Sequence, residues 1–306
     1  MRPGDRSRPR RTRPHRQGPA GIGRQQVAAR RPPRRFPHDA HQEDPRVRHR
    51  RGSRGGRAGG SGVSTAAIVV IGNEILSAKI ADENGPWLTR ELRNLGVEVR
   101  RIETVPDEIP LIVDALERAK SQAKWVFTSG GIGPTHDDVT IAAVAQAFGR
   151  KVVPDPRILG MLQAHYGDRL NAARRRLADV PEGADIDWHE GAYFPVISLE
   201  GIAVLPGPPV LFKEGFGRIR ERFRSAPLFG RAVYLALGEG ELAEHLDATV
   251  ARFPQVSIGS YPRFDQRADY RVKITFDGRS EDEVREAFAF FRKRLPEPAI
   301  LREESS

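Results

Sequence analysis

The fold is decided by the stretch Thr128-Ser129-Gly130-Gly131-Ile132-Gly133-Pro134-Thr135-His136-Asp137-Asp138-Val139-Thr140. An apolar run, Trp125 to Phe127, leads into it, and a helical pattern from Val139 to Phe148 follows it. The stretch is therefore predicted to join the end of a strand to the start of a helix. Glycines at such a junction let backbone N–H groups approach a phosphate, and the helix N-terminus adds a partial positive charge.

Two adjacent acids, Asp137 and Asp138, add carboxylates to the same turn. One carboxylate can cap the helix, which leaves the other free to hold a divalent cation that bridges phosphates. Glycines, hydroxyls and paired acids together favour a phosphorylated small-molecule ligand bound with Mg²⁺. The loop is not a Rossmann fingerprint, because His136 stands where the third glycine belongs, and no Gly-Lys-Ser/Thr follows as in a P-loop. We interpret His136 as a solvated loop residue.

The charge of the chain is concentrated in residues 1–62. This segment holds 18 Arg, no Lys and four acids, a net charge of +14, whereas the whole chain carries +10. Residues 63–306 therefore carry −4. The segment is rich in Arg, Gly and Pro and cannot bury a core, so we predict a disordered tail, or upstream codons outside the working protein. Its alternative role is an arm that binds nucleic acid, and no other part of the chain suggests nucleic-acid binding.

The remaining composition narrows the possible chemistry. The chain has no cysteine, which excludes disulfides, thiolate metal sites and cysteine nucleophiles. It also has no run of 18 apolar residues, so no membrane span is expected. We expect a cytoplasmic protein, and any metal held by carboxylates is expected to be Mg²⁺ or Mn²⁺ rather than Zn²⁺.

Apolar runs alternate with helical patterns from Ala66 onward. Ala66–Ile71, Val97–Val105 and Trp125–Thr128 are predicted strands, and a helical pattern follows each of them. Three consecutive β-α units predict a three-layer α/β/α domain with a mostly parallel sheet over residues 63–226. Ligands bind at the carboxyl ends of such strands, so the loops after Ile71, Val105 and Phe127 are expected to meet.

The second half of the chain gives further predictions. Asp155-Pro156 is expected to open a helix, and Glu200-Gly201 marks a hairpin between Tyr193–Leu199 and Ile202–Leu205. The pattern of residues 227–306 predicts a strand, a helix, two strands and a helix, in that order. This order indicates a small α+β domain. Arg174-Arg175-Arg176 can either reach a phosphate or form a solvated helix face.

The polar residues near the predicted sheet edge have two possible roles, helix capping and ligand binding. Asp82, Asn84 and Asp107 each lie between a strand and a helix, where capping is the ordinary role of such side chains. Their shared position beside the glycine loop favours a role in ligand binding.

Four segments together resemble the molybdopterin-binding (MoaB/Mog-like) domain, in the version found in CinA and at the N-terminus of eukaryotic FAD synthase. The segments are Val70 to Leu76, Asp82 to Asn84, Gly130 to Thr140 and Leu205 to Pro209. The similarity covers residues 66–224, and residues 258–273 are similar to the FAD-synthase type.

The resemblance implies a homo-oligomer, with a dimer favoured, that binds molybdopterin or an adenine dinucleotide with a divalent metal. It implies catalytic acids at Asp107, Asp137 and Asp138, with the metal on Asp137 and Asp138. With the sheet-edge argument, the expected ligand-binding residues are Gly72, Asn73, Glu74, Asp82, Asn84, Ser129, Gly130, Gly131, Gly133, Thr135, Thr140, Pro206 and Gly207.

The chain also departs from the family pattern. Glu83 stands where CinA has Thr, and Val210-Leu211-Phe212 replaces the usual x-Glu-Met. No part of the chain resembles CinA's amidase domain or the adenylyltransferase domain of FAD synthase, so deamidation and FAD synthesis are not expected. Three hypotheses follow: a metal-dependent pyrophosphatase acting on FAD or ADP-ribose, a protein that binds or adenylylates molybdopterin, and a non-enzymatic binding module with a nucleic-acid-binding tail.

Overall fold

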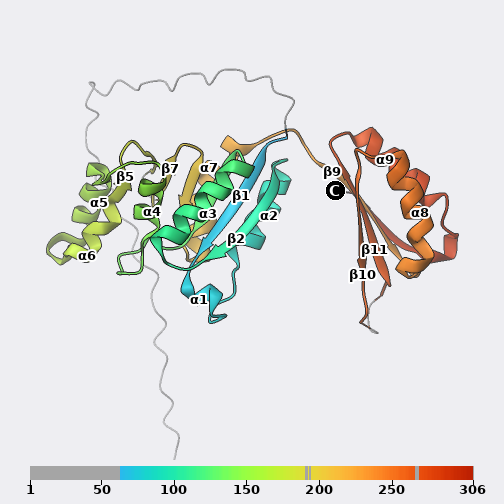
Figure 1. The fold of residues 1–306 in the computed structure, drawn as a ribbon, viewed down its shortest axis with the longest axis horizontal. Coiled ribbons are helices and arrows are strands. Elements are labelled where there is room, and N and C mark those ends of the chain that lie inside the picture. The colour runs from blue at the N-terminus through green and yellow to red at the C-terminus, as the bar shows by residue number, and fades with distance from the viewer. Residues whose placement is uncertain (1–62, 190–191, 193, 266–268, 306) are drawn as a thin grey trace, which may run out of the picture. The chain divides into compact units, whose positions relative to one another are not determined.

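The computed structural model describes residues 63–189, 192, 194–265 and 269–305. The Arg-rich segment 1–62 lies outside the described residues, so its predicted disorder stays a prediction. Two larger sheets organise the described chain, one in residues 65–205 and one in residues 229–305 (Figure 1).

The first sheet has six strands in the order β2-β1-β3-β8-β7-β6. The strands β2, β1, β3 and β8 are parallel to one another, whereas β7 pairs antiparallel with both of its neighbours, β8 and β6. This confirms the predicted α/β class and the mostly parallel sheet. The strands are β1 (Thr65–Ile71), β2 (Glu98–Val105), β3 (Trp125–Ser129), β6 (Asp185–Asp187), β7 (Val196–Leu199) and β8 (Ile202–Leu205).

The three layers follow from the alternation of side chains along β1, which is buried on both faces. Its odd-numbered residues from Ala67 pack on α3 and α4, and its even-numbered residues from Ala66 pack on α2 and α7. The helices of this part are α1 (Asn73–Leu76), α2 (Asn84–Asn94), α3 (Ile109–Gln122), α4 (Thr140–Ala147), α5 (Pro156–Tyr166), α6 (Ala172–Arg175) and α7 (Pro209–Ile219).

Local signals account for several of these elements. Asp155 caps α5 by accepting hydrogen bonds from the N–H groups of Arg157 and Ile158, as its Asp-Pro start predicts. Glu200 and Gly201 both have positive φ, 46° and 87°, which is the geometry of a tight hairpin turn. A small sheet of β4 (Val152–Pro154) and β5 (Asp179–Pro181) was not predicted, because its strands are three residues long and carry no clear alternation.

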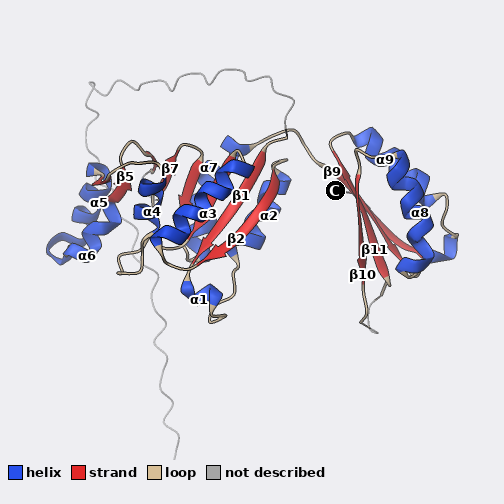
Figure 2. Ribbon diagram, in the orientation of Figure 1, coloured by secondary structure: helices blue, strands red, loops and turns tan. Residues whose placement is uncertain are grey.

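The second sheet is antiparallel, in the order β10-β11-β9-β12, and its apolar core lies between one sheet face and two helices (Figure 2). The predicted order of elements was incomplete, because it lacked β12 at the edge. That strand contains Arg302, Glu303 and Glu304, and such a charged segment is stable as a strand only because β9 pairs with it. The elements are β9 (Phe229–Leu235), α8 (Glu239–Arg252), β10 (Ser257–Pro262), β11 (Val272–Gly278), α9 (Glu281–Arg292) and β12 (Ile300–Ser305).

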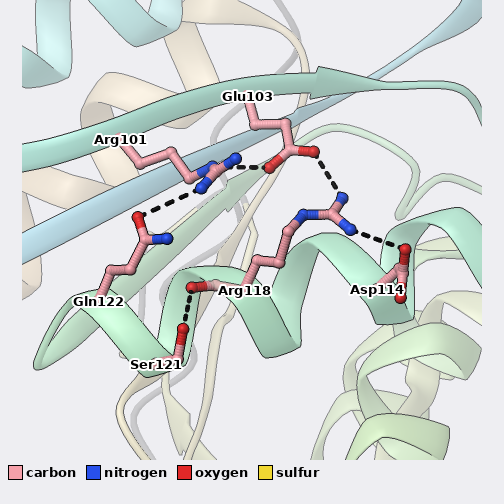
Figure 3. A network of polar contacts seen from close by, with 6 residues as sticks. All are labelled: Arg101, Glu103, Asp114, Arg118, Ser121 and Gln122. Carbon is pink, nitrogen blue, oxygen red and sulfur yellow. Dashed lines mark hydrogen bonds and ion pairs between the residues drawn. The ribbon is translucent and has the colours of Figure 1, made fainter.

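A polar network joins the edge strand β2 to α3 (Figure 3). Glu103 accepts hydrogen bonds from Arg101 Nε at 2.9 Å and from Arg118 at 2.6 Å, and Arg118 also contacts Asp114 at 2.7 Å. The pKa of Glu103 is lowered, first by the hydrogen bond from Arg118 and then by the charges of both arginines, while burial opposes the shift.

This network makes the free energy of unfolding depend on pH. A lowered pKa in the folded state gives stability that is complete above the unfolded value, about 4.3, and is lost as the pH falls through the folded value. We expect Glu103→Gln to lower the free energy of unfolding by about 1 kcal/mol at pH 7. The difference from the parent should shrink below about pH 4.3, as measured by urea unfolding across pH.

The matched control is Glu117→Gln, because Glu117 is exposed on the same helix, α3. It should leave the pH dependence unchanged. Equal pH profiles for the parent and Glu103→Gln would show that Glu103 does not contribute to the pH dependence of the free energy of unfolding.

Candidate functional site

The carboxyl ends of the parallel strands meet through backbone contacts between their loops. Gly72 N–H donates to the carbonyl of Val105 at 3.1 Å, which joins the loops after β1 and β2. Gly130 N–H donates to the carbonyl of Leu205 at 3.2 Å, which joins the ends of β3 and β8. Gly130 also approaches the carbonyl of Ile71 so closely that a Cβ there would lie 2.3 Å from its oxygen, so the loops after Ile71, Val105 and Phe127 converge as expected.

Asp107 links two of these loops through its side chain. Its Oδ2 accepts a hydrogen bond from the backbone N–H of Asn73 at 2.8 Å. The helix after it, α3, begins without a side-chain cap, so the ordinary capping role does not apply to Asp107. Asp107 instead holds the chain where it leaves β1.

Two glycines give the loop after β3 its path. Gly130 and Gly131 have φ values of 102° and 65°, in the left-handed region. A Cβ on Gly130 would lie 2.3 Å from the carbonyl oxygen of Ile71, and one on Gly131 would lie 2.3 Å from Thr140 Oγ1. Any other residue at either position would push the loop away from β1 or α4.

Thr140 fastens this turn from the other side. Its Oγ1 donates to the carbonyl of Gly130 at 2.9 Å, and its N–H donates to the carbonyl of Gly131 at 2.9 Å. The side chain is fully buried. Thr140 therefore fixes the shape of the loop from its buried side.

Asp138 is bound within its own loop through both carboxylate oxygens. Oδ1 accepts from the Gly133 N–H at 2.6 Å, and Oδ2 accepts from the Thr135 N–H at 2.8 Å. The expectation that one of the paired acids caps the helix was wrong. The helix α4 begins at Thr140, with Val139 at the N-cap and no side-chain cap, because the carboxylate folds back onto the loop.

Asp137 and Asp138 meet at a single hydroxyl. Thr135 Oγ1 lies 2.5 Å from Asp137 Oδ1 and 2.5 Å from Asp138 Oδ2. The hydroxyl carries one proton and can donate to only one of these oxygens. The hydrogen bond from Thr135 is also the main reason that the pKa of Asp137 is lowered. Neighbouring His136 is exposed, as expected of a solvated loop residue.

Asn84 joins this loop to the turn after β8. Its amide nitrogen donates to Ser129 Oγ at 2.9 Å and to the carbonyl of Gly207 at 2.7 Å. A carbonyl only accepts, so the nitrogen must face Gly207 and the orientation of the amide is fixed. Asn84 Oδ1 is buried and accepts no hydrogen bond from the described residues.

Asp82 has the capping role that the sequence left open for it. Its Oδ1 accepts from the N–H groups of Asn84 and Gly85, both at 3.0 Å, at the start of α2. The carboxylate thereby fixes the backbone of Asn84 beside the loop.

These loops enclose a cavity of about 620 Å³, within the range of small-molecule sites. Ten of the expected residues line it: Glu74, Asp82, Asn84, Ser129, Gly130, Gly131, Gly133, Asp138, Pro206 and Gly207. The other expected residues lie outside its wall: Gly72, Asn73, Asp107, Thr135, Asp137 and Thr140.

The wall of this cavity is acidic. Four carboxylates line it, from Glu74, Asp82, Glu83 and Asp138, and the described lining includes no Lys, Arg or His. Across the described residues, no three His, Cys, Asp or Glu side chains converge as a metal site. Any protein ligands for a metal would thus be limited to pairs such as Asp137 and Asp138.

Sequence reasoning missed the apolar part of the wall. Ile80, Leu177, Phe194 and Leu211 also line the cavity, and all four come from segments distant in sequence from the glycine loop. Only Leu211 carried a signal, because it stands where the family pattern has Glu. The other positions are set by the tertiary fold.

Comparisons with known proteins identify the family of the chain. A family profile described as "Probable molybdopterin binding domain" matches residues 67–224, half of the chain. The chain belongs to this family. A second profile, "FAD synthase, middle domain", matches residues 227–304.

Relatives extend the similarity beyond one domain. An Archaeoglobus fulgidus protein is 33% identical over 228 residues, which cover 74% of this chain and 96% of that protein. A "CinA-like protein" of a Mycobacterium species is 33% identical, covering 79% of this chain and 62% of the relative. A "Probable FAD synthase" of Caenorhabditis briggsae is 29% identical over 72% of this chain, but the match spans only 47% of its length.

A solved structure also resembles the chain. The CinA protein from Thermoplasma acidophilum has 26% sequence identity and a TM-score of 0.49, and the match covers 53% of this chain and 98% of that protein.

Among the described residues, none of the helices combines the length and apolar character needed to span a bilayer.

The bonds of Asp138 predict how the loop responds to mutation. Asp138→Asn places an NH₂ group against one of the two N–H donors, so the hydrogen bond from Gly133 or Thr135 is lost. We expect amide hydrogen exchange in residues 131–138 to become about tenfold faster, as measured by mass spectrometry.

Asp137→Asn is the matched control. The Asp137 carboxylate bonds to the hydroxyl of Thr135 and to its own backbone N–H and lies 3.9 Å from His136 Nδ1, but it does not hold the N–H of Gly133 or Thr135. Exchange there should change little. Similar exchange rates in Asp138→Asn and the parent would show that the loop keeps its shape without this carboxylate.

Proposed function

We propose that the chain is a metal-dependent pyrophosphatase that releases AMP from an ADP-containing dinucleotide such as FAD or ADP-ribose. The observation that carries the proposal is the meeting of Asp137 and Asp138 around Thr135 Oγ1, beside a glycine loop at the cavity. Mg²⁺ commonly binds through one or two carboxylates together with substrate phosphates, and this oxygen pair suits that mode.

The acidic wall supports the need for a cation. A pyrophosphate ligand is an anion, and the four carboxylates of the lining would repel it in the absence of positive charge. The buried Asn84 Oδ1 favours a ligand that also brings an N–H or O–H donor, such as an adenine amino group or a ribose hydroxyl.

In the proposed reaction, water attacks one phosphorus, the bond from that phosphorus to the bridging oxygen breaks, and the bridging oxygen leaves with the other phosphate. The products are AMP and a second phosphate monoester, which is FMN from FAD or ribose 5-phosphate from ADP-ribose. When bound, Mg²⁺ would neutralise phosphate charge and lower the pKa of the water. Asp107 has one oxygen, Oδ1, outside its bond to Asn73, and is our candidate to accept the water's proton. Asp138 would keep the loop in shape, because it already occupies the N–H of Gly133.

A second candidate function is the binding or adenylylation of molybdopterin, with a pterin phosphate in place of water. The description of the matching family favours it. The unpartnered Asn84 Oδ1 fits it too, since a pterin ring offers N–H donors.

We further propose a cytoplasmic homo-oligomer, with a dimer favoured, in which one subunit supplies each complete site. Mixing inactive Asp107→Asn and Asp138→Asn chains tests this layout. Activity should stay lost, because no mixed assembly contains an intact site. Recovery of about a quarter of the parent activity would show that two chains share each site.

The first test of activity is a substrate screen. We expect the full chain to release AMP from FAD or ADP-ribose with Mg²⁺, Mn²⁺ or Co²⁺, and to stop when EDTA removes the metal. NAD and ATP are tested in separate reactions as alternative substrates, and AMP is measured by chromatography. If no AMP appears from any of the four with any metal, the hydrolase proposal fails and molybdopterin becomes the ligand to test.

Variants then test the carboxylates. Asp138→Asn should lower turnover by a factor on the order of 100, and His136→Ala should cost much less because His136 is exposed. Equal turnover by Asp138→Asn and the parent would exclude Asp138 from the reaction.

A further inference from the structure

The three consecutive arginines at residues 174–176 have different surroundings. Arg174 stacks over the ring of Tyr166 at 4.5 Å, within its own local segment. Arg175 is exposed on the surface of α6. Arg176 reaches 42 residues back along the chain and donates a hydrogen bond to the carbonyl of Pro134 at 2.5 Å. Only Arg176 therefore contacts the glycine loop.

Arg176 also stands at the edge of the ligand cavity. The next residue, Leu177, lines that cavity directly. Arg176 itself lines a smaller cavity of about 190 Å³, and Gly133 and Asp138 line both cavities. Arg176 therefore lines the same small cavity as Asp138 and Gly133, and that cavity shares part of its wall with the ligand cavity.

The position of Arg176 is important because the other charged residues around the two cavities are acids. The described lining of the two cavities contains five acids, Glu74, Asp82, Glu83, Asp138 and Asp179, and a single cationic side chain, Arg176. A guanidinium has five N–H donors, and the bond to Pro134 uses one of them. The side chain is exposed, so its other donors can meet a ligand.

We propose that Arg176 binds a phosphate of the ligand, acting from the short 3-10 turn directly after α6, while its bond to Pro134 fixes the guanidinium in place. The inference rests on the phosphate site of the proposed function, but it requires no hydrolysis. Arginine suits the task because its planar fork donates two parallel hydrogen bonds to a phosphate, which lysine does not.

The test is titration calorimetry of the full chain with inorganic pyrophosphate and with ADP, both in the presence of Mg²⁺. Arg176→Ala should weaken both affinities about tenfold or more. Arg176→Lys should recover part of the loss, because it restores the charge. Arg176→Gln should recover little, although its amide can still donate to the Pro134 carbonyl.

Arg175→Ala is the matched control, because it removes the same charge from the neighbouring position. Its affinities should stay within about twofold of the parent, since Arg175 is exposed and an exposed charge that does not contact the ligand is screened by salt. Hydrogen exchange in residues 131–138 is measured in each variant as the readout for loop shape, and it should not change with Arg176→Lys.

Three results would overturn the inference. The first is a parent that binds neither pyrophosphate nor ADP. The second is equal weakening by Arg175→Ala and Arg176→Ala. The third is full recovery by Arg176→Gln, which would reduce Arg176 to a support for the loop. Loss of anion binding in Arg176→Ala without AMP release by the parent would sustain the inference and refute the pyrophosphatase.

Discussion

The site depends on one constraint, the absence of a Cβ at Gly130 and Gly131. Strand β3 must end within contact of β1 and turn at once into the segment that leads to α4. A side chain at either glycine would collide with Ile71 or with Thr140. Left-handed φ values at both positions let the chain make this turn, and Thr140 then closes it with two hydrogen bonds. The cavity wall follows from that turn.

Three acids at the site bind the protein backbone. Asp138 holds the Gly133 and Thr135 N–H groups, Asp107 holds the Asn73 N–H, and Asp82 holds the first N–H groups of α2. Such bonds to backbone donors fix the loops before a ligand arrives, which lowers the entropy cost of binding. Substituting one of these acids therefore changes loop geometry as well as charge, and activity alone does not separate the two effects.

The lining of the cavity carries acids although the proposed ligand is an anion. Positive charge must come from a bound cation, from Arg176, or from both. The two carboxylates at Thr135 Oγ1 favour the cation, and the exposed guanidinium over the glycine loop favours a direct contact to phosphate. Membership in the molybdopterin-binding-domain family is consistent with a phosphorylated ligand of either kind, a dinucleotide or a pterin.

The sequence by itself determined the parallel sheet, the junction at residues 128–140 and the convergence of three loops, because apolar periodicity and glycine positions are local signals. It did not determine the role of each polar group. Whether Asp138 caps a helix or holds a loop depends on which backbone N–H lies nearest, and that is decided by how β3 and α4 pack. The same holds for β12, whose charged residues become a strand only beside β9, and for Arg176, which the fold brings to Pro134 across 42 residues of chain. Contacts distant in sequence leave no periodic trace, so only the tertiary structure reveals them.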